Sequence, residues 1–128
     1  MKSKTFYSIA AALCLLGIAI HELAGTPQVL PPLHETDLPN SVIWLHYFTW
    51  HITSIFLAGF AAIYFYCARY TGNKPFAIIS SLVFLGLGVT GVILAIGYDS
   101  SLWSTPAPYY WFIVASFGLL GVKMEKSN

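Results

Sequence analysis

Four apolar stretches alternate with short polar segments along the chain. They cover residues 5–24, 41–68, 75–97 and 107–122. About 20 apolar residues are needed for a helix to cross a hydrocarbon core of about 30 Å. The first three stretches reach this length, and the fourth lies at its lower limit. The pattern therefore predicts an all-α integral membrane protein, a bundle of four antiparallel transmembrane helices that forms a single domain over residues 1–128.

Three polar segments connect these stretches. Residues 70–74 contain Gly72 and Asn73 and predict a tight turn, whereas residues 25–40 contain four prolines and predict a longer loop. Residues 98–106 form a second loop on the same side as residues 25–40. Their aromatic neighbours are typical of the headgroup region of a membrane.

The composition agrees with a membrane protein and excludes other classes. The chain is 57% hydrophobic and only 9% charged, whereas soluble domains carry about 25% charged residues. Its net charge of +1 offers no basic surface for nucleic acid. The expected surroundings are therefore a lipid bilayer, with a homodimer or a larger membrane complex as possible assemblies.

The basic residues orient the predicted bundle. All six fall in the segments on one side of the membrane: Lys2, Lys4, Arg69, Lys74, Lys123 and Lys126. Because Lys and Arg gather in cytoplasmic segments, both termini are expected in the cytoplasm of a bacterial inner membrane, with loops 25–40 and 98–106 in the periplasm. A cleaved signal peptide is disfavoured, since a cut after Ala24 would place Glu22 where a small residue is required.

Helical spacing assigns a small-residue stripe to each of the first three stretches. The stripes are Ala10, Cys14, Gly17, His21 and Ala24; Tyr47, His51, Ser54, Ala58 and Ala62; and Ala77, Ser81, Gly88, Gly91 and Ala95. Small residues allow helix backbones to approach, so each stripe is expected to face the bundle interior. Two of the stripes carry a histidine near the predicted periplasmic end.

These two histidines are expected at the same depth. His21 is 17 residues from Lys4 and His51 is 18 residues from Arg69, which corresponds to about 25–27 Å at a rise of 1.5 Å per residue. His46 is rotated by about 140° from His51 on the same helix, so the two do not ligate one centre without distortion.

The residue types predict a cofactor site built mainly from His21 and His51. Two imidazoles from facing helices suit a b-type haem, and imidazoles with carboxylates suit iron, copper or zinc. Glu22, His46 and Asp99 are the supporting candidates for a metal site. His34, Glu35 and Asp37 are interpreted as solvated loop residues.

Two other classes of function remain open from the sequence. The aromatic second stretch, 44–66, would offer a lateral surface in a non-catalytic subunit of a larger complex. A small transporter or channel is the third possibility, although no charge or proline-broken helix lies at mid-membrane. The chain contains no GxSxG elbow and no phosphate-binding glycine loop, and whether it is an enzyme stays open.

Overall fold

The computed structural model describes residues 3–125, which contain helices joined by short connections and no strand. The four long helices are α1 (Ser3–Ala19), α3 (Asn40–Arg69), α4 (Lys74–Gly97) and α5 (Ala107–Met124). The predicted all-helical class is confirmed for this part of the chain.

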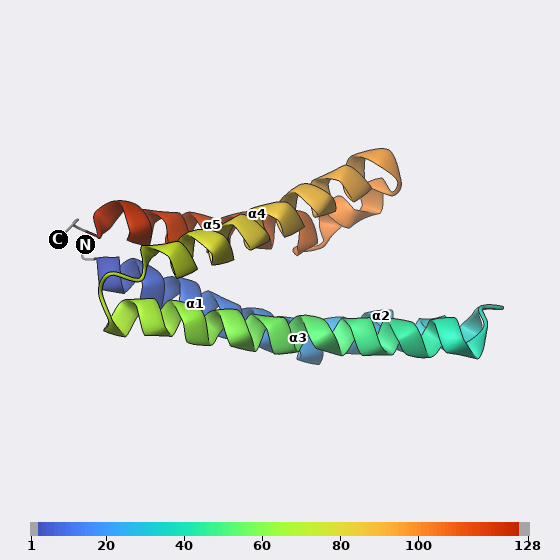
Figure 1. The fold of residues 1–128 in the computed structure, drawn as a ribbon. Helices are drawn as coiled ribbons and strands as arrows, with labels where there is room; N and C mark the ends of the chain where they lie inside the picture. Colours follow the sequence, from blue (N-terminus) through green and yellow to red (C-terminus); the bar gives the residue numbers. More distant parts are fainter. Residues whose placement is uncertain (1–2, 126–128) are drawn as a thin grey trace.

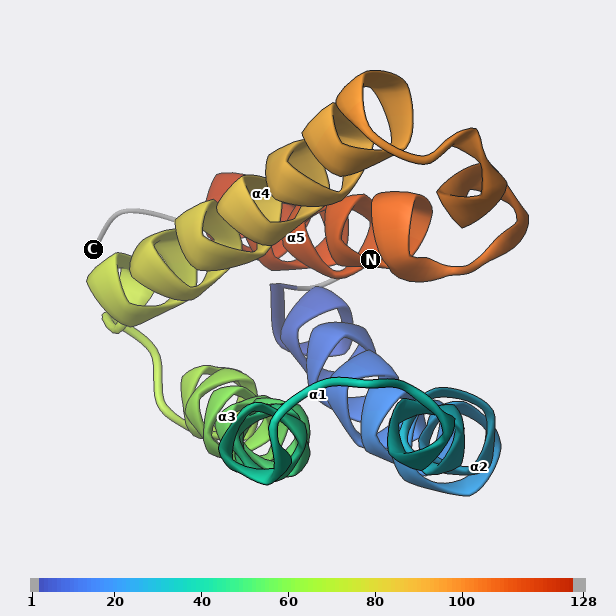
Figure 2. The same ribbon diagram turned by 90° about the vertical axis from the view of Figure 1, so that its right-hand side faces the viewer.

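The helices form two hairpins (Figure 1). In one, α1 packs along α3; in the other, α4 packs along α5, and α5 also contacts α1. The hairpins approach each other where α1 begins and α5 ends, and diverge toward the other end, as two views show (Figures 1 and 2). The converging end carries Lys4, Arg69, Lys74 and Lys123 and is called the basic end below.

The main cluster of buried residues lies in the half of the molecule nearest the basic end. Its largest fully buried side chains are Tyr7, Tyr64, Phe84 and Val114. The ring of Phe84 lies 4.9 Å from Phe60 and 5.9 Å from Trp111, centroid to centroid, so α3, α4 and α5 share one aromatic layer. Such rings contribute large buried areas, which explains why the hairpins are joined here.

Two of the three predicted stripes face the interior over most of their length, although Ala24 at the end of the first is exposed. Ala10, Cys14 and Gly17 are buried on α1, and the α4 stripe is buried at Ala77, Ser81, Gly88 and Ala95. On α3 the prediction was wrong by roughly one residue. Ala58 and Ala62 are exposed, and the buried face is instead Leu57, Ala61 and Tyr64. On this buried face the Tyr64 hydroxyl pairs with Ser81 on α4 at 2.9 Å.

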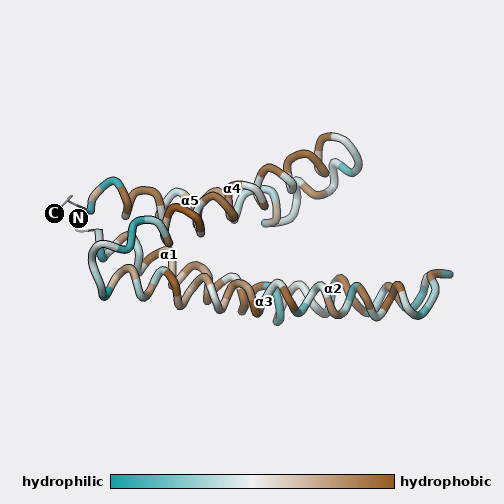
Figure 3. The backbone as a smooth tube through the Cα atoms, in the orientation of Figure 1, coloured by the Kyte–Doolittle hydropathy of each residue, from teal (hydrophilic) through white to brown (hydrophobic). Residues whose placement is uncertain are grey.

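Among residues 3–125, three segments are long and apolar enough to cross a membrane: Ser3–Glu35, Asn40–Arg69 and Lys74–Gly97. The 18-residue α5 is not among them, although the sequence predicted a fourth span. Many large apolar side chains on α3 and α4 are exposed. Apolar residues recur along the helices, and polar residues gather at the helix ends (Figure 3). These features are consistent with a membrane protein.

The predicted loop 25–40 is largely helical. After α1 the chain continues as the π-helix η1 (Ile20–Gly25), then α2 (Thr26–Val29) and the 3₁₀-helix η2 (Pro31–Glu35). Prolines stand in the first turns of α2 and η2, where an amide hydrogen has no partner in any case. The prolines therefore start new helical segments here, and only residues 36–39 separate η2 from α3.

One carboxylate closes the basic end. Glu125 is 8% exposed and accepts hydrogen bonds from the Tyr7 hydroxyl at 2.8 Å and from the Gly72 amide at 2.6 Å. Gly72 has φ +91°, a conformation that glycine adopts without strain. Glu125 thus connects the first helix, the α3–α4 turn and the end of α5.

Candidate functional site

The π-helix η1 carries His21 and Glu22. The Thr26 amide donates to the carbonyl of His21, five residues back. Pro27, in the next position, has no amide hydrogen to donate to the α-helical acceptor, the carbonyl of Leu23. Proline and π segments are the usual causes of a register change in a helix, and single π turns recur at functional sites.

Glu22 is the centre of a hydrogen-bonded group that we call the histidine cluster. Its members are His21, Glu22 and Thr26 from the first segment and Trp50, His51 and Ser54 from α3. The Glu22 carboxylate accepts from the Ser54 hydroxyl at 2.5 Å, from Nδ1 of His51 at 3.2 Å and from the Thr26 hydroxyl at 3.1 Å. Three donors converge on one carboxylate, an arrangement that favours its ionised form.

The network assigns the same tautomer to both imidazoles. An ionised carboxylate only accepts, so Nδ1 of His51 carries the proton that it donates to Glu22. Ser54 gives its own hydrogen to Glu22, so its oxygen accepts from Nδ1 of His21 at 3.1 Å. The Nε2 lone pair of each ring is therefore left for another partner. Within residues 3–125 neither Nε2 has a hydrogen bond.

Trp50 covers one face of His21. The two rings stack with centroids 4.0 Å apart and an interplanar angle of 15°. The indole N–H donates to the Thr26 hydroxyl at 2.8 Å, which in turn donates to Glu22. Gly25 makes this possible, because a Cβ there would lie 2.8 Å from Cζ2 of Trp50.

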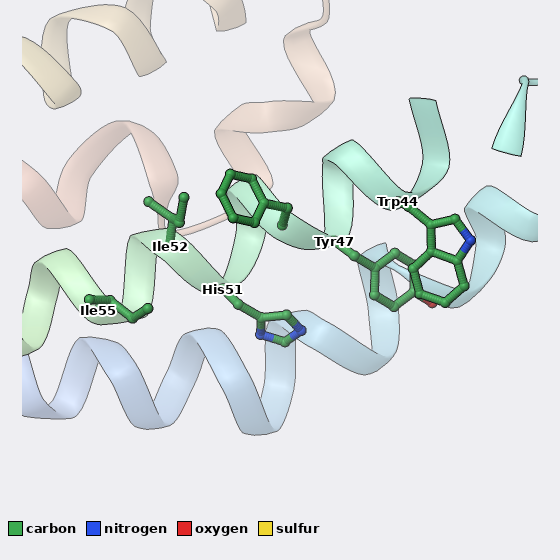
Figure 4. Close-up of a pocket in the computed structure, with 6 residues that line it drawn as sticks. Trp44, Tyr47, His51, Ile52 and Ile55 are labelled. Carbon is green, nitrogen blue, oxygen red and sulfur yellow. The ribbon is translucent and has the colours of Figure 1, made fainter. Parts of the chain in front are cut away.

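The cluster is half open to its surroundings. The side chains of His21, Glu22 and His51 are 17%, 28% and 49% exposed. His51 lies in a shallow groove of about 510 Å³ on the face of α3, and its ring extends toward the neighbouring first segment (Figure 4). The groove is lined by Trp44, Tyr47, Phe48, His51, Ile52 and Ile55.

The other candidate residues lie apart from this cluster. Nδ1 of His46 bonds the Val42 carbonyl of its own helix at 3.0 Å. Asp99 precedes the 3₁₀-helix η3 (Ser100–Ser104), and its carboxylate accepts a hydrogen bond from the Ser101 amide at 2.9 Å. This hydrogen bond lowers the pKa of the Asp99 carboxyl. His34 contacts the Tyr47 hydroxyl through Nε2 at 3.2 Å.

The predicted five-residue ligand set is thus divided. His21, Glu22 and His51 are neighbours, whereas His46 and Asp99 have partners elsewhere. In the part of the chain that the structure describes, no three His, Cys, Asp or Glu side chains are arranged to hold a metal ion among themselves. Any metal bound here would need ligands from outside this set.

Three members of the cluster were not predicted as site residues: Thr26, Trp50 and Ser54. Ser54 was visible as the next position after His51 on the predicted stripe, and Trp50 precedes Ser54 by one helical turn. Thr26 gave no signal, because its position depends on the π segment.

Searches of protein-family models, of curated proteins and of solved structures found no match to this chain.

Proposed function

We propose that the histidine cluster binds a transition-metal ion through Nε2 of His21 and of His51. The observation that carries the proposal is the tautomer assignment. Glu22 holds Nδ1–H of His51, and Ser54 connects Glu22 to Nδ1 of His21. A histidine that ligates a metal usually gives its other ring N–H to such a carboxylate, which fixes the ring and raises its basicity.

The geometry favours a metal ion over a b-type haem. Glu22 Oε1 lies 3.2 Å from Nδ1 of His51 and 3.6 Å from Nδ1 of His21, so the two nitrogens are at most about 7 Å apart. With metal–nitrogen bonds of about 2 Å, imidazoles on opposite faces of a haem hold their Nδ1 atoms about 8 Å apart. The smaller angle of a tetrahedral ion brings the same atoms within about 7 Å.

Two imidazoles leave the remaining positions of a tetrahedral ion for ligands that the cluster does not supply. Water, a substrate or a partner protein would fill them, and an open position is the condition for chemistry at a metal. Imidazole suits zinc, copper and iron alike. The stacked Trp50 and the 17% exposure of the His21 side chain limit access from that side.

The same proposal places the site at the periplasmic face of a bacterial inner membrane, with both termini in the cytoplasm. All six Lys and Arg residues occur in sequence segments on the opposite side from the cluster. Such a bias is the established sign of the cytoplasmic side. The three apolar spans are consistent with insertion in a bilayer.

The test is metal binding by protein purified in mild detergent. Elemental analysis and titration are expected to show one transition-metal ion per chain, and the His21→Ala, His51→Ala double variant is expected to lose it. His46→Ala is the matched control, because His46 lies on the same helix as His51 and its Nδ1 bonds the Val42 carbonyl of that helix. Equal metal content in the double variant, or stoichiometric haem with a Soret band, would contradict the proposal. Stable co-purification of a larger enzyme without metal would favour the accessory-subunit function instead.

A further inference from the structure

Each of the four long helices brings one cation to the basic end. Lys4 lies in the first turn of α1, Arg69 ends α3, Lys74 begins α4 and Lys123 lies in the last turn of α5. The side chains of Lys4, Arg69 and Lys123 are exposed, and that of Lys74 is half-buried. The positive charge is therefore distributed over all four helix ends that meet here (Figure 1).

The described part of the chain supplies no carboxylate to these cations. Glu125 lies at the same end, but it is buried and accepts hydrogen bonds from the Tyr7 hydroxyl and the Gly72 amide. Within residues 3–125 the ion pairs join Glu22 to histidines, and none involves Lys or Arg. The structure thus turns its one acid at this end inward and leaves the cations to pair with groups outside the chain.

Aromatic side chains adjoin two of these cations. Tyr66 and Tyr70 lie near Arg69 on α3, are exposed, and have ring centroids 4.9 Å apart. Phe76 is exposed two residues after Lys74 on α4. Tyrosine is typical of the headgroup level of a membrane. Lys and Arg lay their apolar stems along such a surface and keep the charged head at its polar edge.

This combination favours a lipid over a soluble partner. A phospholipid carries a phosphate directly above its acyl chains, so it meets the cations and the exposed aromatic rings together. A soluble acidic peptide would pair with the cations and leave the apolar side chains of α3 and α4 uncovered. Because α3 and α4 are long and apolar enough to span a bilayer, lipid lies next to both helix ends in a membrane.

We propose that the basic end binds anionic phospholipids of the leaflet that it faces, with the phosphates at the Lys and Arg side chains and the exposed tyrosines at the headgroup level. Cations next to a membrane span attract anionic lipids, and the attraction grows with each charge. The opposite end of the described chain has acids and no Lys or Arg. The inference rests on insertion in a bilayer, which is part of the proposed function, and is independent of the metal site.

The experiment measures lipid binding by metal-free protein in mild detergent, to which phosphatidylglycerol or phosphatidylcholine is added. Native mass spectrometry is expected to show retained phosphatidylglycerol, and this lipid is expected to raise the thermal unfolding midpoint more than phosphatidylcholine does. The Arg69→Gln, Lys74→Gln double variant should bind phosphatidylglycerol more weakly, by about fivefold for each cation removed. High salt should reduce the preference in the wild-type protein, because it screens exposed charges.

The matched control is the Glu35→Gln, Asp37→Asn double variant. It also changes two exposed charges, but at the opposite end of the molecule, and it should keep the wild-type preference. The His21→Ala, His51→Ala double variant should keep it as well. Loss of metal binding with the lipid preference intact would reject the metal proposal alone.

Three results would overturn the lipid proposal. Equal binding of the two phospholipids by the wild-type protein would show no selection for charge. An unchanged preference in the Arg69→Gln, Lys74→Gln variant would show that these cations are not the binding groups. Equal stabilisation by glycerol phosphate, or displacement of the lipid by a polyglutamate peptide, would identify a site for soluble anions instead.

Discussion

Glu22 decides the chemistry of the histidine cluster because its two oxygens accept from Ser54, His51 and Thr26. A carboxylate in an apolar segment is costly unless its lone pairs are occupied. Here the donors that satisfy it are also the groups that set the tautomer of each imidazole. Ser54 makes this connection by hydrogen bonds, since its hydroxyl lies between Glu22 and Nδ1 of His21, whereas the direct distance from that nitrogen to Glu22 is 3.6 Å.

We predict that Ser54→Ala weakens metal binding by about 10- to 100-fold, the range for loss of a group that orients a ligand. Without the hydroxyl, Nδ1 of His21 loses its acceptor and its ring is free to adopt the other tautomer. Competitive titration against a chromophoric chelator measures the change. Ser116→Ala is the control, because the Ser116 hydroxyl bonds the carbonyl of Phe112 in its own helix. Unchanged affinity in Ser54→Ala would remove Ser54 from the proposed site.

At this scale the sequence identified part of the cluster. Counting residues from the basic side placed His21 and His51 at one depth, and the structure connects both through Glu22 and Ser54. The count could not reveal the hydrogen bonds, because these depend on side-chain rotamers and on the π register at Glu22. It also could not separate His46, whose partner is a backbone carbonyl.

At the scale of single elements, the π-helix η1 is what brings the first segment against Trp50. Periodicity did not predict it. A run of four prolines between 25 and 40 indicated a loop, but three of them begin helical turns, where their fixed φ suits the helix. At Gly25 the first segment lies so close to α3 that a Cβ would come within 2.8 Å of Trp50.

We predict that Gly25→Ala disrupts the cluster. The new Cβ would lie 2.8 Å from Cζ2 of Trp50, so the indole must move away from His21 and Thr26. Metal affinity should fall, and the unfolding midpoint in detergent should fall with it. The same change at Gly59 meets no atom within 4 Å, and there Ala is expected to stabilise the helix by about 0.5–1 kcal/mol. Equal effects at the two glycines would contradict this explanation.

At the scale of the whole molecule, the two hairpins are joined mainly near the basic end. Glu125 contributes there by accepting from Tyr7 and from the Gly72 amide. The cationic end was predicted from the sequence, but no role was predicted for Glu125. Its partners, Tyr7 and Gly72, are 118 and 53 residues away in the chain. Contacts of such separation have no local pattern in the sequence.

We therefore predict that Tyr7→Phe lowers the free energy of unfolding by about 1–3 kcal/mol, because a buried oxygen of Glu125 loses its donor. Reversible denaturation in mixed detergent gives this quantity. Tyr70→Phe is the control: Tyr70 is 58% exposed and also lies at the basic end. A loss no larger than that of Tyr70→Phe would show that Glu125 does not hold the hairpins together.

The orientation of the whole molecule decides which compartment supplies ligands to the cluster. With the termini in the cytoplasm, Thr36 and Ser101 face the periplasm and Asn73 faces the cytoplasm. Single cysteines at these positions are distinguishable by a membrane-impermeant maleimide, because both native cysteines, Cys14 and Cys67, are buried. We expect Thr36→Cys and Ser101→Cys to be labelled in spheroplasts and Asn73→Cys only after lysis. Labelling of Asn73→Cys alone in spheroplasts would show the opposite orientation. The histidine cluster would then take its metal from the cytoplasm.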